Sequence, residues 1–278
     1  MFYKSLLTLT LVLAIAANAS ANTTRTRVED YSVMPGAHVN VKINGGPINV
    51  KAGAAGKVHV ELVAVANASS EKELDELIAK AQPIIEQKGQ QIRVVLHDGD
   101  HGGSWSWWHS DNGVHFRVNL IVPTAVDLDL DTSGGPINVD GEVQGEVHVH
   151  TSGGPISITG ATGKLDLDTS GGGITVDRVL QQLHADTSGG SIQIGYVGPD
   201  VVDINADTSG GNISIGLDAA GNYDLDADTS GGNVSINGLS FDASRQDRTH
   251  AEGRINRGGA RVRADTSGGN VDIHAAHR

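Results

Sequence analysis

Hydrophobic and polar residues alternate one by one through most of the second half of the chain. Leu165-Asp166-Leu167-Asp168-Thr169 is one such run, and Ile174-Thr175-Val176 follows it after a glycine-rich segment. Successive side chains of a β-strand point to opposite faces of a sheet. An alternation of period two therefore predicts strands with one buried and one exposed face.

These strands belong to a repeat that is marked by the tetrad Thr-Ser-Gly-Gly. The tetrad begins at Thr132, Thr151, Thr169, Thr187, Thr208, Thr229 and Thr266, so the spacings are 19, 18, 18, 21, 21 and 37 residues. We interpret the longest gap as two units, because His250–Ile255 aligns with the tetrad and the isoleucine that follows it. This interpretation predicts eight consecutive units.

The same aliphatic columns recur in every unit, before the tetrad and after it. A single unit buries little, whereas stacked units share one continuous interior. We therefore expect an all-β fold, a parallel β-solenoid of about eight rungs with a small N-terminal α+β cap. A left-handed hexapeptide helix needs an apolar residue at every sixth position, and a calcium-loaded nonapeptide roll needs Gly-Gly-x-Gly-x-Asp. Neither pattern is present.

The first residues are typical of an export signal. Lys4 precedes the apolar run Leu6–Ala17, and Ala19-Ser20-Ala21 has the small residues of a cleavage site. The apolar run is too short to span a bilayer. We expect residues 1–21 to be a signal peptide and the mature chain, without a transmembrane segment, to reach the periplasm or the cell surface.

Residues 22–125 are less regular and are expected to cap the solenoid, which we assign to residues 126–278. Gly45-Gly46-Pro47-Ile48 copies the repeat, so rung-like structure is expected from about residue 37. Ser70 followed by Glu73 is a capping-box signature that predicts a helix, and Pro83 should kink or shorten that helix.

Composition excludes several classes of function. The chain has 20 Lys and Arg against 33 Asp and Glu, a formal net charge of −13, and no Cys. A phosphate backbone needs a basic surface, so nucleic-acid binding is not expected. Without Cys there are no disulfides, zinc–thiolate sites or thiol nucleophiles.

The run Leu120-Ile121-Val122-Pro123 and the later Leu128-Asp129-Leu130-Asp131-Thr132-Ser133-Gly134-Gly135-Pro136-Ile137 resemble the DUF4097 family of exported bacterial β-repeat proteins. The resemblance covers roughly residues 35 to 275. It implies a parallel β-solenoid and an adhesin role, and it brings no established catalytic residues.

The stretch Asp131–Pro136 also resembles the nucleophile segment of trypsin-like proteases. A catalytic serine is needed once, beside one His and one Asp, whereas this tetrad occurs seven times. We interpret it as a turn in which Gly-Gly permits positive φ, an Asp or Ser oxygen accepts from turn amides, and Thr hydroxyls bond between rungs.

An outward column of mostly acidic residues stands immediately before each tetrad. It is predicted to bind calcium or magnesium weakly through Asp131, Asp168, Asp186, Asp207 and Asp228, because hard cations prefer oxygen ligands. The alternative is a solvated structural face. The column also contains His150 and Asp265.

All three tryptophans lie between Gly99 and Gly113, the least repetitive part of the chain. Exposed aromatics stack on sugars or partner surfaces, so the predicted ligand-binding residues are Trp105, Trp107, Trp108, His101 and His109. A transition-metal site formed with the neighbouring Asp residues and simple packing over the solenoid end are the alternatives.

The last part of the chain adds a basic patch, which consists of Arg245, Arg248, Arg254, Arg257, Arg261 and Arg263. It would suit an anionic glycan, a lipid headgroup or the Asp face of another protomer. Internal pairing with Asp is the alternative.

Together these features favour an exported, non-enzymatic adhesin or cell-envelope binding scaffold. Its expected partner is an envelope glycan or a protein, and no cofactor is expected beyond weakly bound calcium. An envelope-stress sensor or regulatory module stays open, as does a polysaccharide-active solenoid enzyme. An enzyme needs a cleft with a single, non-repeated set of acid, base and cation ligands, and the sequence shows no such set.

Overall fold

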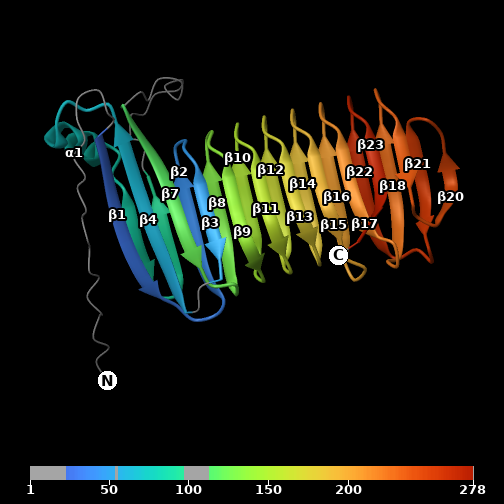
Figure 1. The fold of residues 1–278 in the computed structure, drawn as a ribbon, viewed down its shortest axis with the longest axis horizontal. Helices are drawn as coiled ribbons and strands as arrows, with labels where there is room; N and C mark the ends of the chain where they lie inside the picture. Colours follow the sequence, from blue (N-terminus) through green and yellow to red (C-terminus); the bar gives the residue numbers. More distant parts are fainter. Residues whose placement is uncertain (1–22, 54–55, 97–112, 278) are drawn as a thin grey trace.

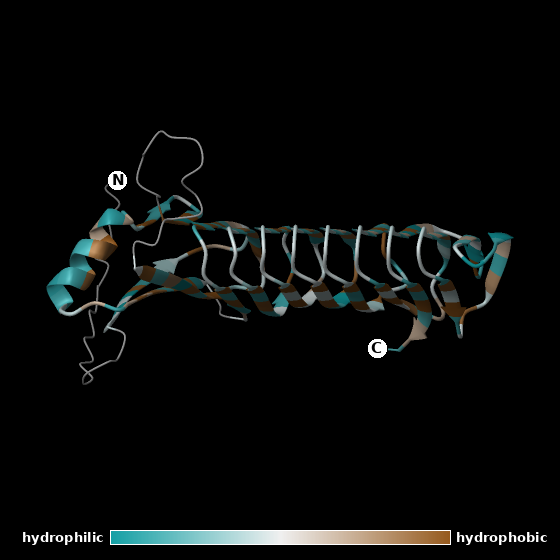
Figure 2. Ribbon diagram, turned by 90° about the horizontal axis from the view of Figure 1, so that it is seen from above, coloured by the Kyte–Doolittle hydropathy of each residue, from teal (hydrophilic) through white to brown (hydrophobic). Residues whose placement is uncertain are grey.

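The computed structural model describes residues 23–53, 56–96 and 113–277. In these residues the chain forms two long β-sheets and one helix, α1 (Glu71–Lys80), at the N-terminal end (Figure 1). The sheets face each other and are joined by short turns along the whole stack (Figure 2). The prediction of an all-β fold with long parallel sheets is confirmed.

Both sheets run along the long axis of the molecule. The eleven-stranded sheet has the order β1 (Thr23–Ser32), β4 (Lys57–Ala66), β7 (Val114–Val122), β3 (Ile48–Ala52), β9 (Ile137–Val143), β11 (Ile156–Ala161), β13 (Ile174–Val179), β15 (Ile192–Val197), β17 (Ile213–Asp218), β23 (Val271–Ala276) and β19 (Val234–Asn237). The twelve-stranded sheet has the order β20 (Phe241–Gln246), β21 (His250–Ile255), β18 (Tyr223–Thr229), β22 (Ala260–Thr266), β16 (Asp203–Thr208), β14 (Gln182–Thr187), β12 (Lys164–Thr169), β10 (Val147–Thr151), β8 (Val126–Thr132), β2 (Ala37–Ile43), β6 (Gln91–Val95) and β5 (Ile84–Lys88).

Each repeat unit contributes one strand to each sheet, with the tetrad as the turn between them. Neighbouring units pair in parallel and in register, so that Thr169 lies opposite Thr187 and Leu165 opposite Leu183. The leucines are buried in the space between the sheets. Burial of one such side chain contributes about 1.5–3 kcal/mol, and the stacked columns make this contribution repeat along the molecule.

The tetrad turn joins neighbouring units through its threonine. Thr187 Oγ1 donates to the carbonyl oxygen of Gly172 in the adjacent unit (2.8 Å) and accepts from the Gly190 amide of its own turn (3.3 Å). The same two bonds recur at five other tetrads. The accepting oxygen is therefore that of the threonine, and our interpretation of an Asp or Ser acceptor is wrong.

The second glycine of each tetrad is required because the backbone of the adjacent turn lies too close for a Cβ atom. A Cβ added at Gly190 would lie 2.0 Å from the carbonyl oxygen of Gly172, whereas at Gly189 the nearest atom is 3.5 Å away. The tetrad glycines do not adopt positive φ, so the expected reason for the glycine pair is also wrong. Glycine lets adjacent turns stack at the spacing of the strands.

The C-terminal unit does not continue the stack in chain order. Strand β22 lies between β16 and β18, and β23 lies between β17 and β19, which Figure 1 shows as darker strands within the orange end of the molecule. Thr266 therefore pairs with both Thr208 and Thr229. We call this arrangement the intercalated unit.

The eighth unit that we placed at His250–Ile255 is wrong. This segment is β21, which pairs antiparallel with β18 and with β20. It brings the chain back along β18, and a turn with positive φ at Asn256 and Gly258 then leads into β22 on the other side of β18. The 37-residue gap thus holds a hairpin instead of a second rung.

At the N-terminal end, β2 and β3 stack on β8 and β9 in the same parallel register, as expected from the copy of the repeat near residue 37. Strands β1, β4 and β7 pair antiparallel beyond them. Helix α1 begins after Ser70, whose side chain accepts from the Glu73 amide, and it ends before Pro83. The predicted signal peptide and the tryptophan segment lie outside the described residues.

Candidate binding face

The two sheets expose different chemistry to solvent. On the eleven-stranded sheet the outward column that follows the turn is mostly neutral, and Asn138 donates from its side-chain amide to Asn49 (3.0 Å). This column continues through Ser157, Thr175, Gln193 and Ser214. On the twelve-stranded sheet the outward columns carry charges, so this sheet holds most of the groups that could recognise a charged ligand.

The acidic column that we predicted to bind cations lies on the twelve-stranded sheet. From one end of the stack to the other, register places side by side Lys42, Asp131, His150, Asp168, Asp186, Asp207, Asp265, Asp228 and His250. Lys42 stands at one end of this row and His250 at the other. Between His150 and His250 five carboxylates follow one another on adjacent strands. We call this row the acidic column.

The five predicted metal ligands do not converge on one point. Asp131 forms an ion pair with Lys42 (2.8 Å), and Asp168 lies 3.8 Å from Nδ1 of His150. Asp186 and Asp207 have carboxylates as their neighbours on the adjacent strands. Calcium prefers six to eight converging oxygens, which a straight row does not supply. Weak calcium binding stays a prediction, which calorimetry at millimolar calcium tests.

Asp207 is a partly buried carboxylate that stands between two others, Asp186 and Asp265. Burial raises the pKa of the Asp207 carboxyl, and the neighbouring carboxylates of Asp265 and Asp186 raise it further. Arg263 and His184 act in the opposite direction. The fold thus holds this carboxylate against an electrostatic penalty.

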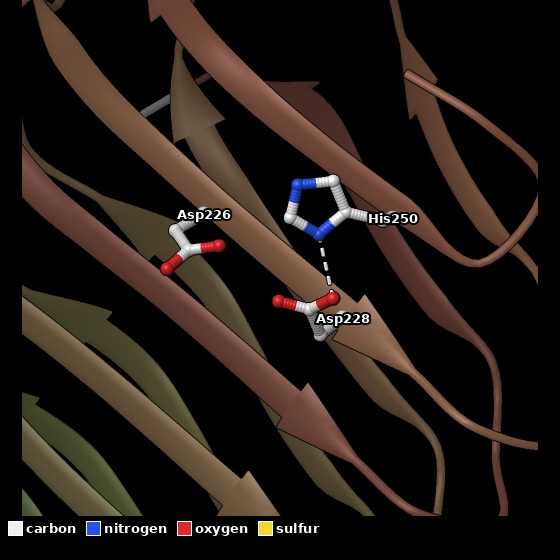
Figure 3. A group of neighbouring side chains, drawn as sticks. All are labelled: Asp226, Asp228 and His250. Atoms are coloured by element: carbon white, nitrogen blue, oxygen red, sulfur yellow. Dashed lines mark hydrogen bonds and ion pairs between the residues drawn. The ribbon is translucent and has the colours of Figure 1, made fainter. Parts of the chain in front are cut away.

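Asp228 is the one predicted metal ligand that belongs to a compact group. Nδ1 of His250 on β21 donates to Oδ1 of Asp228 on β18 (2.6 Å), and Asp226 faces the same space (Figure 3). One ligand atom from each of the three residues lies within 4.8 Å of the other two. Two carboxylates and an imidazole are ligand types for a divalent transition metal.

The protonation of this group is shaped by its own charges. Burial raises the pKa of Asp226, and the charge of Asp228 and a hydrogen bond with it raise that pKa further. Arg263 and His250 lower it. The nearby guanidinium already compensates part of the negative charge that a metal ion would neutralise.

Two grooves lie side by side over the outer face of the twelve-stranded sheet. One of about 660 Å³ lies over β18, β20, β21 and β22, and the other of about 620 Å³ lies over β12, β14, β16 and β22. Arg261 and Arg263 of β22 line both grooves and stand between them. The grooves share this wall because the intercalated unit places β22 between β16 and β18.

The basic patch that we predicted divides into paired and unpaired residues. Arg254 pairs with Asp242 (2.9 Å), Arg245 with Asp247 (3.6 Å) and Arg263 with Asp265 (3.3 Å). Arg248 donates to the Gly232 carbonyl oxygen, and Arg257 donates to the Asn222 side chain. Within the described residues Arg261 has no ion pair, although Asp203 and Asp224 are its register partners on the two adjacent strands.

Sequence reasoning missed that the arginines and the acidic residues share these grooves. Asp207 and Asp265 directly precede two of the tetrads, and Asp203 and Arg261 stand four residues before them. The alternation therefore predicts that Asp203 and Arg261 lie on the same face of the sheet. Their adjacency was not, because it depends on the intercalated unit. The predicted ligand-binding residues His101, Trp105, Trp107, Trp108 and His109 lie outside the described residues, and their role stays a prediction.

The model of Toastrack DUF4097 matches residues 24–274. The chain belongs to the Toastrack DUF4097 family. No curated protein matches this member of the family. No helix among the described residues is long and apolar enough to cross a membrane.

Solved structures that this Toastrack protein matches share little of its sequence. A "putative cell adhesion protein" from Clostridium sporogenes is 14% identical, covers 90% of this chain and 99% of its own, and has a TM-score of 0.33. A "putative adhesin" from Bacteroides fragilis is 12% identical, with coverages of 89% and 96% and a TM-score of 0.39. A "putative lipid binding protein" from Parabacteroides distasonis is 11% identical, with coverages of 91% and 97% and a TM-score of 0.39.

Proposed function

We propose that this protein is an exported, non-enzymatic scaffold that binds a glycan of the cell envelope. The observation that supports this proposal is the pair of grooves over the twelve-stranded sheet, with Arg261 and Arg263 between them. The grooves are lined by planar polar side chains such as Asp, Asn, Gln, Glu and Arg. Groups of this kind form the directional hydrogen bonds that sugar hydroxyls accept and donate.

The scaffold role follows from how rigidly the face is held. Each strand that lines the grooves is paired with a neighbouring strand on both sides, except for the edge strand β20. The threonine bonds tie each turn to the next. A binding face held in this way loses little conformational entropy when a ligand binds, which favours affinity.

The repeated turn argues for a structural use of its hydroxyls. The threonine of the tetrad is buried, and its hydroxyl donates to the adjacent turn and accepts from a glycine amide of its own turn. A nucleophilic site requires a hydroxyl beside a general base in a unique cleft. We therefore assign the tetrads to the fold and the grooves to binding.

In this proposal the tryptophan segment adds stacking platforms for sugar rings. The test is a glycan array probed with the wild-type protein and with a variant in which Trp105, Trp107 and Trp108 are replaced by Ala. We expect envelope-type glycans to bind the wild type and to bind the triple variant more weakly. An array without any signal for the wild type would overturn glycan binding, and equal signals for both proteins would remove the tryptophans from it.

A further inference from the structure

Arg261 is a cation that the fold leaves available for a ligand. It is exposed on β22, where Asp203 on one side and Asp224 on the other are its register partners. Within the described part of the chain it forms no ion pair with either of them. Its neighbour Arg263, two residues along the same face, is already paired with Asp265 (3.3 Å).

Two acceptors on β16, one opposite Arg261 and the other opposite Arg263, are also without partners. Oδ1 of Asp203 and Oδ1 of Asn205 are buried atoms that accept no hydrogen bond from the described residues. Both residues line the groove of about 620 Å³ that Arg261 also lines. An unpaired buried acceptor is unfavourable, so a rotation of either side chain that brings this oxygen to the groove, where a ligand hydroxyl donates to it, is favoured.

The charges of the grooves limit which ligand fits. The chain carries a net charge of −13, and Asp166, Asp203 and Asp207 line the groove beside the two arginines. A polymer with a negative charge on every unit would meet these carboxylates and be repelled. A wholly neutral polymer would leave the guanidinium of Arg261 without its best partner, since carboxylates bind guanidinium in a bidentate, charge-assisted way.

We propose that Arg261, with the free acceptors of Asp203 and Asn205, forms a subsite for a glycan whose acidic sugars alternate with neutral, hydroxyl-rich sugars. The carboxylate of the acidic sugar lies on Arg261, and hydroxyls of its neutral neighbours donate to the two acceptors. This inference rests on the proposed function, because it names the class of glycan that the same grooves take.

The test uses two oligosaccharides of equal length and the full-length mature protein. Hyaluronan octasaccharide alternates glucuronate with N-acetylglucosamine, and a chitin octasaccharide contains the neutral sugar alone. Calorimetry is carried out with wild type, with Arg261→Gln, and with Arg257→Gln as the matched control, because Arg257 is exposed on the same part of the chain but lines neither groove. Thermal unfolding verifies that both variants are folded.

We expect wild type and Arg257→Gln to bind hyaluronan with the same Kd, and Arg261→Gln to bind it at least tenfold more weakly. We also expect the wild-type Kd for chitin oligosaccharide to be at least tenfold higher than for hyaluronan, and the difference to shrink as salt is raised. Equal hyaluronan binding by wild type and Arg261→Gln would overturn the subsite, as would equal wild-type affinity for the two sugars.

The two proposals fail in different ways. If neither oligosaccharide binds while the array gives other envelope glycans that bind, the subsite is wrong and glycan binding stands. If neither the array nor calorimetry detects binding of any glycan, the proposal of glycan binding itself is wrong.

Discussion

Replacement of one carboxylate in the acidic column is expected to stabilise the protein. Asp207 lies between Asp186 and Asp265 on adjacent strands. Asp207→Asn keeps the shape and the outward position of the side chain and removes its charge. The change therefore removes the cost of burying this charge together with its repulsion by the two neighbouring carboxylates.

The magnitude follows from the spacing of the strands. Neighbouring column residues are about 5 Å apart, and two unit charges at that distance in water repel by about 0.8 kcal/mol. Two neighbours and screening by physiological salt give a total of about 1 kcal/mol. Arg263 and His184 offset part of it, so we expect Asp207→Asn to raise the free energy of unfolding by about 0.5–1 kcal/mol at pH 7.

The increase in the free energy of unfolding caused by Asp207→Asn should grow as the pH rises. The pKa of Asp207 is raised in the folded protein above its ordinary value of 3.8, so the native state binds this proton more tightly than the unfolded state. The contribution of Asp207 to the free energy of unfolding of the wild type is fully present below pH 3.8, and it is lost as the pH rises through the pKa of the folded state. The difference between Asp207→Asn and wild type should thus be near zero in acid and grow toward neutral pH.

Urea denaturation between about pH 3 and pH 8 measures this difference, with Asp131→Asn as the matched control. Asp131 stands in the same column but pairs with Lys42 (2.8 Å), so its replacement should leave the protein unchanged or less stable at pH 7. A destabilised Asp207→Asn at neutral pH, or equal effects of the two replacements, would refute the assignment of the penalty to the row of like charges.

Two further predictions concern the turns. Gly190→Ala should destabilise the protein by at least about 2 kcal/mol, because its Cβ would lie 2.0 Å from the Gly172 carbonyl oxygen, whereas Gly189→Ala, with its nearest atom at 3.5 Å, should be nearly neutral in the same urea titration. Thr187→Val should lose about 1–3 kcal/mol because it leaves the Gly172 carbonyl and the Gly190 amide without partners. Thr187→Ser, which keeps the hydroxyl and removes only the methyl group, should lose less; a Thr187→Val variant that is as stable as the wild type, or more stable than Thr187→Ser, would contradict the role of the two bonds.

The alternation and the repeat predicted most of the fold. Period two assigned the strands, and the equivalence of Thr169 with Thr187 assigned their register, because a shift by one residue would expose every buried side chain. The order of the last units could not be predicted. Units that end at Thr208, Thr229 and Thr266 present the same columns, so the pattern does not tell which two are neighbours.

The binding face was predictable only in part. The outward positions of Asp207, Asp228 and Arg261 follow from the alternation. The group of Asp226, Asp228 and His250 was not predictable, because His250 was aligned with a tetrad threonine and comes from an antiparallel strand. The shared arginine wall of the two grooves likewise requires the intercalated unit.

The intercalated unit is the central claim, since the register of the C-terminal strands and the grooves both depend on it. The chain has no Cys, so pairs of cysteines can be introduced without interference. Asp272 of β23 lies opposite Ser214 of β17 and opposite Ser235 of β19. A disulfide needs Cα atoms within about 7 Å, which adjacent strands satisfy and strands separated by a third do not.

The direct measurement is therefore oxidative cross-linking of the folded protein, followed by peptide mapping. Ser214→Cys with Asp272→Cys should form a disulfide within one chain, and Ser214→Cys with Ser235→Cys should stay reduced. A disulfide between positions 214 and 235, with none between 214 and 272, would place the units in chain order and contradict the intercalated unit.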